Sequence, residues 1–130
     1  MPASRITHDM GTIGLKRVIV HGSFAPNGTD ALVAANTYGK GFTVARTGVG
    51  AYLITFDNAY PELVSATPGA QAADATPTIV QFGDYDATAK TLAVLVLQEG
   101  GGTLAAADQT ADANARVSFE CIFRNTSVDY

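Results

Sequence analysis

Ionised side chains are scarce in this chain of 130 residues: only 15% of them are charged, whereas soluble domains typically carry about 25%. The net charge is −4, and no dense group of Lys and Arg occurs, so nucleic-acid binding is not expected. A small domain has much surface to cover, and we therefore interpret the shortage of charge as surface that faces neighbouring subunits. The alternative, a monomer kept soluble by Thr, Ser, Asn, Gln and small Ala, stays open.

Cysteine occurs only once, at Cys121, which excludes an intrachain disulfide. Its alternating apolar context predicts an inert residue in the core. Residues 1–9 contain no apolar segment of the kind that marks a secretion signal. The longest apolar run, from Leu92 to Leu97, is too short to cross a bilayer. We expect synthesis and folding in a cytoplasm, without a membrane partner.

Catalytic and ligand-binding motifs are also lacking. His8 and His21 are the only histidines, and neither has further metal ligands at suitable spacing. No Ser-His-Asp or Cys-His arrangement and no phosphate-binding glycine loop occurs. We therefore expect no enzymatic activity, no metal and no cofactor.

Two pairs of aspartates are the nearest approach to a ligand site. Asp84 and Asp86 flank Tyr85, and Asp108 and Asp112 lie in a later loop. Carboxylates at such spacing can bind calcium or sugar hydroxyls, but an ordinary solvated turn explains both pairs better.

What the sequence does contain is a β-hairpin in residues 41–56. Phe42, Val44 and Arg46 alternate with small or polar residues, and Tyr52, Ile54 and Phe56 do so after a break at residues 47–50. Period-two alternation on both sides of a glycine-containing break is typical of two antiparallel strands. Tyr52 is expected in the core.

Further strands follow from the same alternation, at residues 15–24, 63–73, 78–83, 91–99 and 116–124. Leu92, Val94 and Val96 alternate with other apolar residues, which predicts that the strand at 91–99 is covered on both faces. Residues 31–36 are expected to form a loop or a short strand, with a helical turn as the alternative, residues 84–88 a turn or loop, and residues 100–115 a long loop.

The pattern predicts an all-β fold, an antiparallel β-sandwich or jelly-roll-like domain of about seven to eight strands. This domain spans residues 15–130, and residues 1–14 form an extended N-terminal arm.

Residues 39–62 and 115–127, including Phe56-Asp57-Asn58-Ala59-Tyr60-Pro61 and Val117-Ser118-Phe119-Glu120-Cys121-Ile122-Phe123-Arg124, resemble phage virion surface proteins. Similar segments recur in capsid decoration (cement) proteins and in tail-fibre domains. The resemblance implies a β-sandwich that assembles as a homotrimer and binds without catalysis. The short chain and the lack of a coiled-coil stalk favour decoration over a fibre.

The resulting hypothesis is a decoration protein on the capsid surface of a virion, made in the host cytoplasm. Its partners are the major capsid protein and other copies of itself, with no nucleic acid and no membrane. The arm, with Arg5, Ile6 and His8, is expected to dock on the capsid protein. The alternative is a glycan-recognising tail module that uses Asp84, Tyr85 and Asp86.

Overall fold

The computed structural model of the chain describes residues 17–72, 77–109 and 114–124. The predicted arm at residues 1–14, with Arg5, Ile6 and His8, therefore lies outside the described residues. Within the described ranges, no helix is long and apolar enough to cross a membrane.

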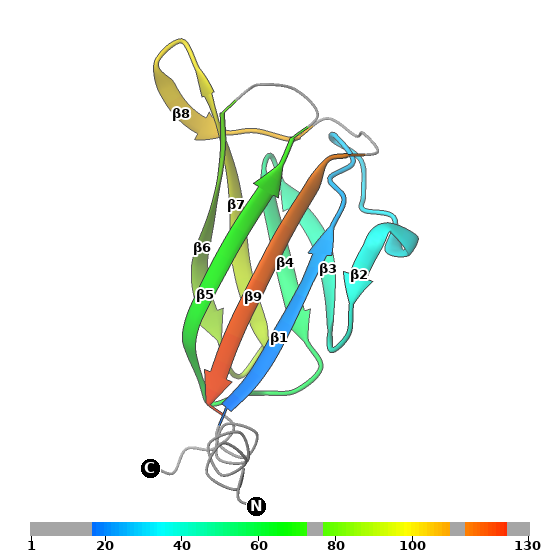
Figure 1. Cartoon of the computed structure of the whole chain (residues 1–130), viewed down its shortest axis with the longest axis vertical. Helices are drawn as coiled ribbons and strands as arrows, with labels where there is room; N and C mark the ends of the chain where they lie inside the picture. The colour runs from blue at the N-terminus through cyan, green and yellow to red at the C-terminus, as the bar shows by residue number, and fades with distance from the viewer. Residues whose placement is uncertain (1–16, 73–76, 110–113, 125–130) are drawn as a thin grey trace, which may run out of the picture.

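Two antiparallel sheets pack face to face (Figure 1). The first has the order β2 (Thr37–Gly39), β1 (Arg17–Phe24), β9 (Arg116–Arg124) and β5 (Glu62–Gln71). The second has the order β3 (Phe42–Gly48), β4 (Ala51–Phe56), β7 (Thr91–Gly100) and β6 (Thr78–Asp86), and β8 (Thr103–Ala106) pairs with the end of β7. The chain crosses from one sheet to the other between β2 and β3, β4 and β5, β5 and β6, and β8 and β9. The predicted β-sandwich is thus confirmed.

The core lies between the sheets and follows directly from the alternation along the strands. Inward positions carry apolar side chains on β9 and β4, and each is almost fully buried: Val117, Phe119, Cys121, Phe123, Tyr52, Ile54 and Phe56. The ring of Phe123 lies 4.8 Å from that of Phe56 and 4.6 Å from that of Tyr60, which closes the end of the sandwich where β9 ends. Cys121 and Tyr52 are core residues, as predicted.

Several strand boundaries match the sequence analysis and others correct it. The hairpin of β3 and β4 and the strand Arg116–Arg124 are confirmed. The prediction of a turn at residues 84–88 was wrong for its first half, because β6 continues through Asp86 after an irregularity between Phe82 and Tyr85. A 3-10 helical turn (Ala34–Asn36) leads into β2.

The predicted long loop at residues 100–115 begins instead with a short strand, β8. With β2 and β8, the described residues contain nine strands rather than the seven or eight expected. Both additional strands have four residues or fewer, so each is too short to show a period of two.

The prediction that β7 is covered on both faces was also wrong. Leu92, Val94 and Val96 are buried between the sheets, whereas Leu95 and Leu97 point to the other side and are only partly buried. No strand or helix of the described chain packs over that outer side. The apolar run from Leu92 to Leu97 therefore forms one buried face and a second apolar face over which no element of the described chain packs.

Candidate functional site

The predicted cluster of Asp84, Tyr85 and Asp86 lies at the end of β6, and its three side chains do not form one exposed surface. The hydroxyl of Tyr85 donates a hydrogen bond of 2.7 Å to the carbonyl oxygen of Tyr60. Its ring lies 5.2 Å from the ring of Phe123. Burial raises the pKa of Tyr85 above its usual value. Tyr85 thus joins the edge of the core, which leaves little of its ring for stacking on a sugar.

Asp86 has a local structural task. Its carboxylate accepts hydrogen bonds from the backbone N–H groups of Thr88 (2.9 Å) and Ala89 (3.0 Å), and so stabilises the turn between β6 and β7. Asp84 is exposed. Of the three residues, only Asp84 presents its side chain to solvent without such a contact in the described structure.

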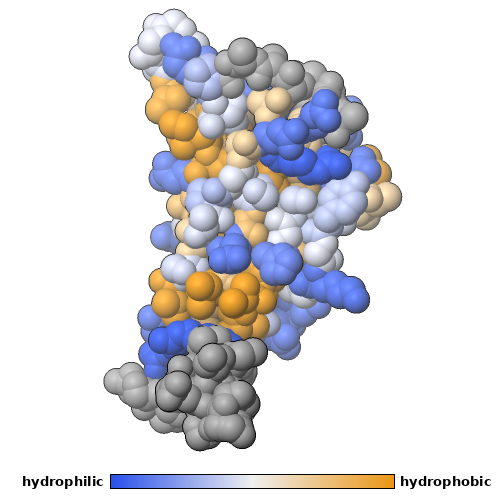
Figure 2. Space-filling model, in the orientation of Figure 1, coloured by the Kyte–Doolittle hydropathy of each residue, from blue (hydrophilic) through white to orange (hydrophobic). Residues whose placement is uncertain are grey.

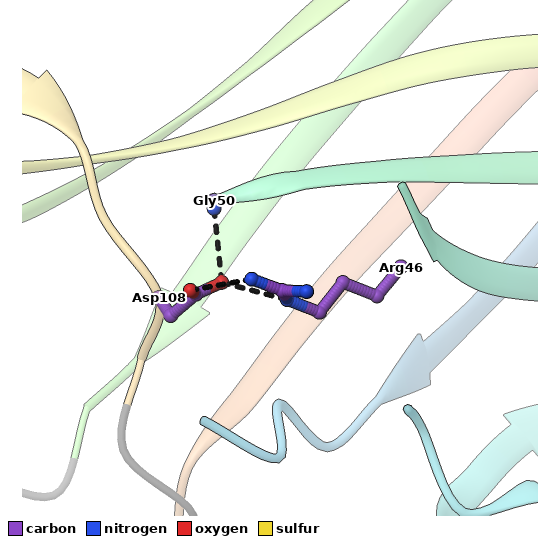
Figure 3. A network of polar contacts seen from close by, with 3 residues as sticks. All are labelled: Arg46, Gly50 and Asp108. Carbon is purple, nitrogen blue, oxygen red and sulfur yellow. Dashed lines mark hydrogen bonds and ion pairs between the residues drawn. The ribbon is translucent and has the colours of Figure 1, made fainter. Parts of the chain in front are cut away.

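The most organised polar site is formed by Asp108, at the β3–β4 hairpin (Figure 3). Arg46 donates two hydrogen bonds to its carboxylate, from Nε to Oδ1 at 3.0 Å and from Nη2 to Oδ2 at 2.7 Å. The backbone N–H of Gly50 donates a third to Oδ1, at 3.0 Å. The two side chains are only 19% and 11% exposed. Paired, partly buried charges of this kind hold segments together, and they leave no free base or nucleophile.

The electrostatics of this site follow from the same contacts. The hydrogen bonds from Arg46 hold the pKa of Asp108 below its usual value, and those to Asp108 raise the pKa of Arg46. Tyr52 pairs with Arg46 across the hairpin, and its buried hydroxyl has no hydrogen-bond partner among the described residues. Burial raises the pKa of Tyr52. The site is thus an ion pair beside a neutral phenol.

Sequence reasoning considered Asp108 only as a weak calcium ligand together with Asp112, which lies outside the described residues. The residue that indicates an ion pair at this site is Arg46, which occupies an inward position of β3 after Phe42 and Val44. A charge on the buried side of a strand needs a partner. Nothing in the sequence says which of the acids supplies it.

Residues 107–109 form a strap across the end of the sandwich. Ala107 donates its N–H to Val96 at 3.1 Å, in the second sheet. The buried side-chain amide of Gln109 donates to the backbone carbonyl of Gln71 at 2.8 Å, in the first sheet, and the backbone carbonyl of Gln109 accepts from the N–H of Gly28 at 3.1 Å. The strap therefore ties both layers together, and Asp108 at its centre fixes it to the hairpin.

His21 and Cys121 offer no reactive centre. His21 is exposed on the outer side of the first sheet, in a shallow hollow of about 370 Å³ that Thr67, Ser118 and Glu120 also line. Within the described ranges, no group of three or more His, Cys, Asp or Glu is arranged to hold a metal ion. Burial raises the pKa of Cys121 to about 12, so its thiol is not ionised at neutral pH.

The outer side of the second sheet carries mostly apolar and uncharged polar side chains. We call it the β7 face, and it comprises the outward positions of the four strands, which pair across the sheet: Thr43, Ala45 and Thr47 on β3; Ala51, Leu53 and Thr55 on β4; Thr91, Ala93, Leu95 and Leu97 on β7; Ile79, Gln81 and Gly83 on β6. None of these residues is ionisable, but two acids occupy outward positions at the ends of the same side: Asp86 on β6, opposite Thr91, and Glu99 on β7, opposite Leu104. An apolar hollow of about 300 Å³ lies near its middle, between Leu53, Ala93 and Leu95.

A comparison of the chain with known protein families, curated proteins and solved structures found no match in any of the three. The functional argument therefore depends on the surfaces described above.

Proposed function

We propose that this chain is a structural virion protein, a homotrimeric decoration (cement) protein that binds the outer surface of a phage head and stabilises the shell. The observation that carries the proposal is the β7 face, a broad outward surface whose acids, Asp86 and Glu99, lie only at its ends. A protein that bridges shell subunits needs extended contacts with neighbours more than it needs a reactive pocket. The resemblance of residues 39–62 and 115–127 to virion surface modules supports the same class.

Docking on the shell is assigned to the N-terminal arm. Residues 1–14 precede β1, and Arg5, Ile6 and His8 combine a cation, an apolar side chain and an imidazole. Such a segment can bind an acidic and apolar groove on a capsid subunit. In this assignment the arm contacts the major capsid protein, and the β-sandwich contacts other copies of the chain.

The test is co-sedimentation with phage heads that lack their decoration protein. We expect the full chain to bind in symmetry-matched copies, and a variant without residues 1–14 to lose at least tenfold in affinity while it keeps its β-sheet circular dichroism. The matched control is a variant without residues 125–130, which follow the end of β9 and should bind like the full chain. Undiminished binding by the variant without the arm would refute the docking role.

The alternative, a glycan-recognising module of a phage tail, receives less support because Tyr85 is engaged with the Tyr60 carbonyl and Asp86 with a turn. It makes a different prediction. Binding to a bacterial surface glycan on an array, lost in Asp84→Ala and in Tyr85→Ala, would favour that alternative over decoration.

A further inference from the structure

We propose that the β7 face is the surface through which one copy of this chain binds another. The proposal rests on the homotrimer of the proposed function, since it names the surface on which those copies meet. It also explains why an apolar run in a two-layer sandwich has one side that its own chain leaves open.

The distribution of apolar and polar side chains on the face is that of a protein–protein interface. Its centre is formed by Leu53, Ala93 and Leu95, around the apolar hollow. Its margin carries hydroxyl and amide groups, from Thr43, Thr47, Thr55, Thr91 and Gln81. An apolar centre with a polar margin is the usual arrangement where two protein surfaces meet.

The lack of charge favours a second copy over an unlike partner. Contacts between different proteins commonly gain specificity from complementary charges, and the centre of this face has none to offer. Its ionisable groups are acids near its two ends, Asp84 and Asp86 in the last residues of β6 and Glu99 near the end of β7. Copies of a chain with net charge −4 repel one another, so contact through the uncharged centre of this face brings few like charges together.

The area of the face is sufficient for a specific contact. Four strands ~4.8 Å apart and about seven residues long at ~3.3 Å per residue give a flat footprint of about 440 Å². The pairing of β8 with β7 extends the sheet and adds exposed Leu104, opposite Glu99. Its four residues bring the footprint to about 500 Å² by the same spacings. With an equal area on the other copy, the contact covers about 1,000 Å², which is the lower limit of about 1,000 Å² for a specific interface.

The opposite side of the molecule provides an internal comparison. Figure 2 looks onto the first sheet and shows a hydrophobic patch near the end where β1 begins. Ile19, which is exposed, pairs with Ile122 there. Charged groups border this patch closely, among them the ion pair of Arg124 with Glu62 at 3.1 Å. Because this patch lies on the opposite sheet and has an ion pair at its border, it is the natural control surface.

The test compares two isoleucines of nearly equal exposure on opposite sides of the sandwich, Ile79 at 47% and Ile19 at 51%. The mass in solution is measured by light scattering after size exclusion, at the same protein concentration for every variant. We expect Ile79→Lys to shift the protein to the monomer and Ile19→Lys to keep the mass of the wild type. Ala45→Lys, at the exposed opposite margin of the β7 face, should act like Ile79→Lys. Thermal melts check that all three variants fold.

The outcomes separate this inference from the proposed function. A wild-type protein that is monomeric at all concentrations, or folded Ile79→Lys and Ala45→Lys variants that keep the wild-type mass, would overturn the inference, and head binding by the arm would still stand. Dissociation by both variants in a protein that never binds heads would support the inference and refute decoration. A wild-type dimer that both variants dissociate would support the face as the interface but contradict the trimer.

Discussion

Gly50 is a position where the structure predicts a large effect of a single methyl group. It lies in the β3–β4 turn with a φ of +62°, where residues with a Cβ are strained. A Cβ added there would lie 2.7 Å from the Ala107 nitrogen and 2.7 Å from the Val96 oxygen. Those two atoms form a hydrogen bond with each other, so the methyl group would press on the strap and on β7 at once.

Two other glycines separate the two causes of destabilisation at Gly50, the positive φ and the close contacts of the added Cβ. Gly28 has a φ of +59° with no atom within 4 Å of an added Cβ, and Gly48 lacks a positive φ and would meet only the Ala51 Cβ, at 4.0 Å. Gly28→Ala should therefore cost about 1–2 kcal/mol through the backbone alone. Gly48→Ala should be neutral or stabilise by up to about 1 kcal/mol, since it restricts the unfolded chain. Gly50→Ala combines the backbone cost with overpacking and should cost about 3 kcal/mol or more.

Urea unfolding followed by circular dichroism measures all three, at one protein concentration because association adds to the apparent stability. The corresponding change in melting temperature is about 3–5 °C per kcal/mol for a domain of this size. The order Gly48→Ala, Gly28→Ala, Gly50→Ala, from most to least stable, is the expected result. A Gly50→Ala variant as stable as Gly28→Ala would show that the strap does not press on the turn, and would refute the reasoning.

Three further predictions concern the polar groups and the cysteine. Because hydrogen bonds from Arg46 hold the pKa of Asp108 below its ordinary 3.8, the carboxylate stabilises the fold above that pH and loses this contribution as the pH falls through the lowered value. Asp108→Asn should thus unfold at lower urea than the wild type at pH 7, and the difference should shrink on acidification below pH 3.8; an unchanged difference would contradict the ion pair. Tyr85→Phe should cost about 1 kcal/mol by loss of the bond to the Tyr60 carbonyl, whereas Asp84→Ala, at an exposed site, should be neutral in the same unfolding assay. Cys121, whose pKa burial raises to about 12, should not react with a thiol reagent at pH 8 in the native protein and should react fully in urea; rapid native labelling would place the thiol at the surface.

The parts of the fold that the sequence predicted are those in which one strand carries a clear alternation. Strand β9, from Arg116 to Arg124, was predicted to the residue because Val117, Phe119, Cys121 and Phe123 occupy every second position. The hairpin was predicted for the same reason, with glycines at the break. In both cases the residues that define the pattern are also the residues that the core buries.

The parts that escaped prediction depend on contacts between distant segments. β2 pairs with β1, and β8 with β7, over three or four residues, so their existence is decided by the neighbouring strand and not by their own sequence. The pairing of Arg46 with Asp108 joins residues 62 positions apart. The sequence shows that Arg46 needs an acidic partner, but only the fold determines which acidic residue lies next to it.

The β7 strand shows how a wrong prediction can carry physical information. A run from Leu92 to Leu97 is typical of a strand that is covered on both sides, and the chain covers only one of them. Threonine at an outward position is compatible both with a β-strand and with exposure to water. Such threonines occur around the margin of the face, at Thr43, Thr47, Thr55 and Thr91. The outward leucines of β7, Leu95 and Leu97, therefore add nothing that a solitary sandwich requires, and an exposed apolar sheet face is a liability for aggregation. The pattern is consistent with a strand whose second cover is another molecule, which is why the proposed contact between copies is placed there.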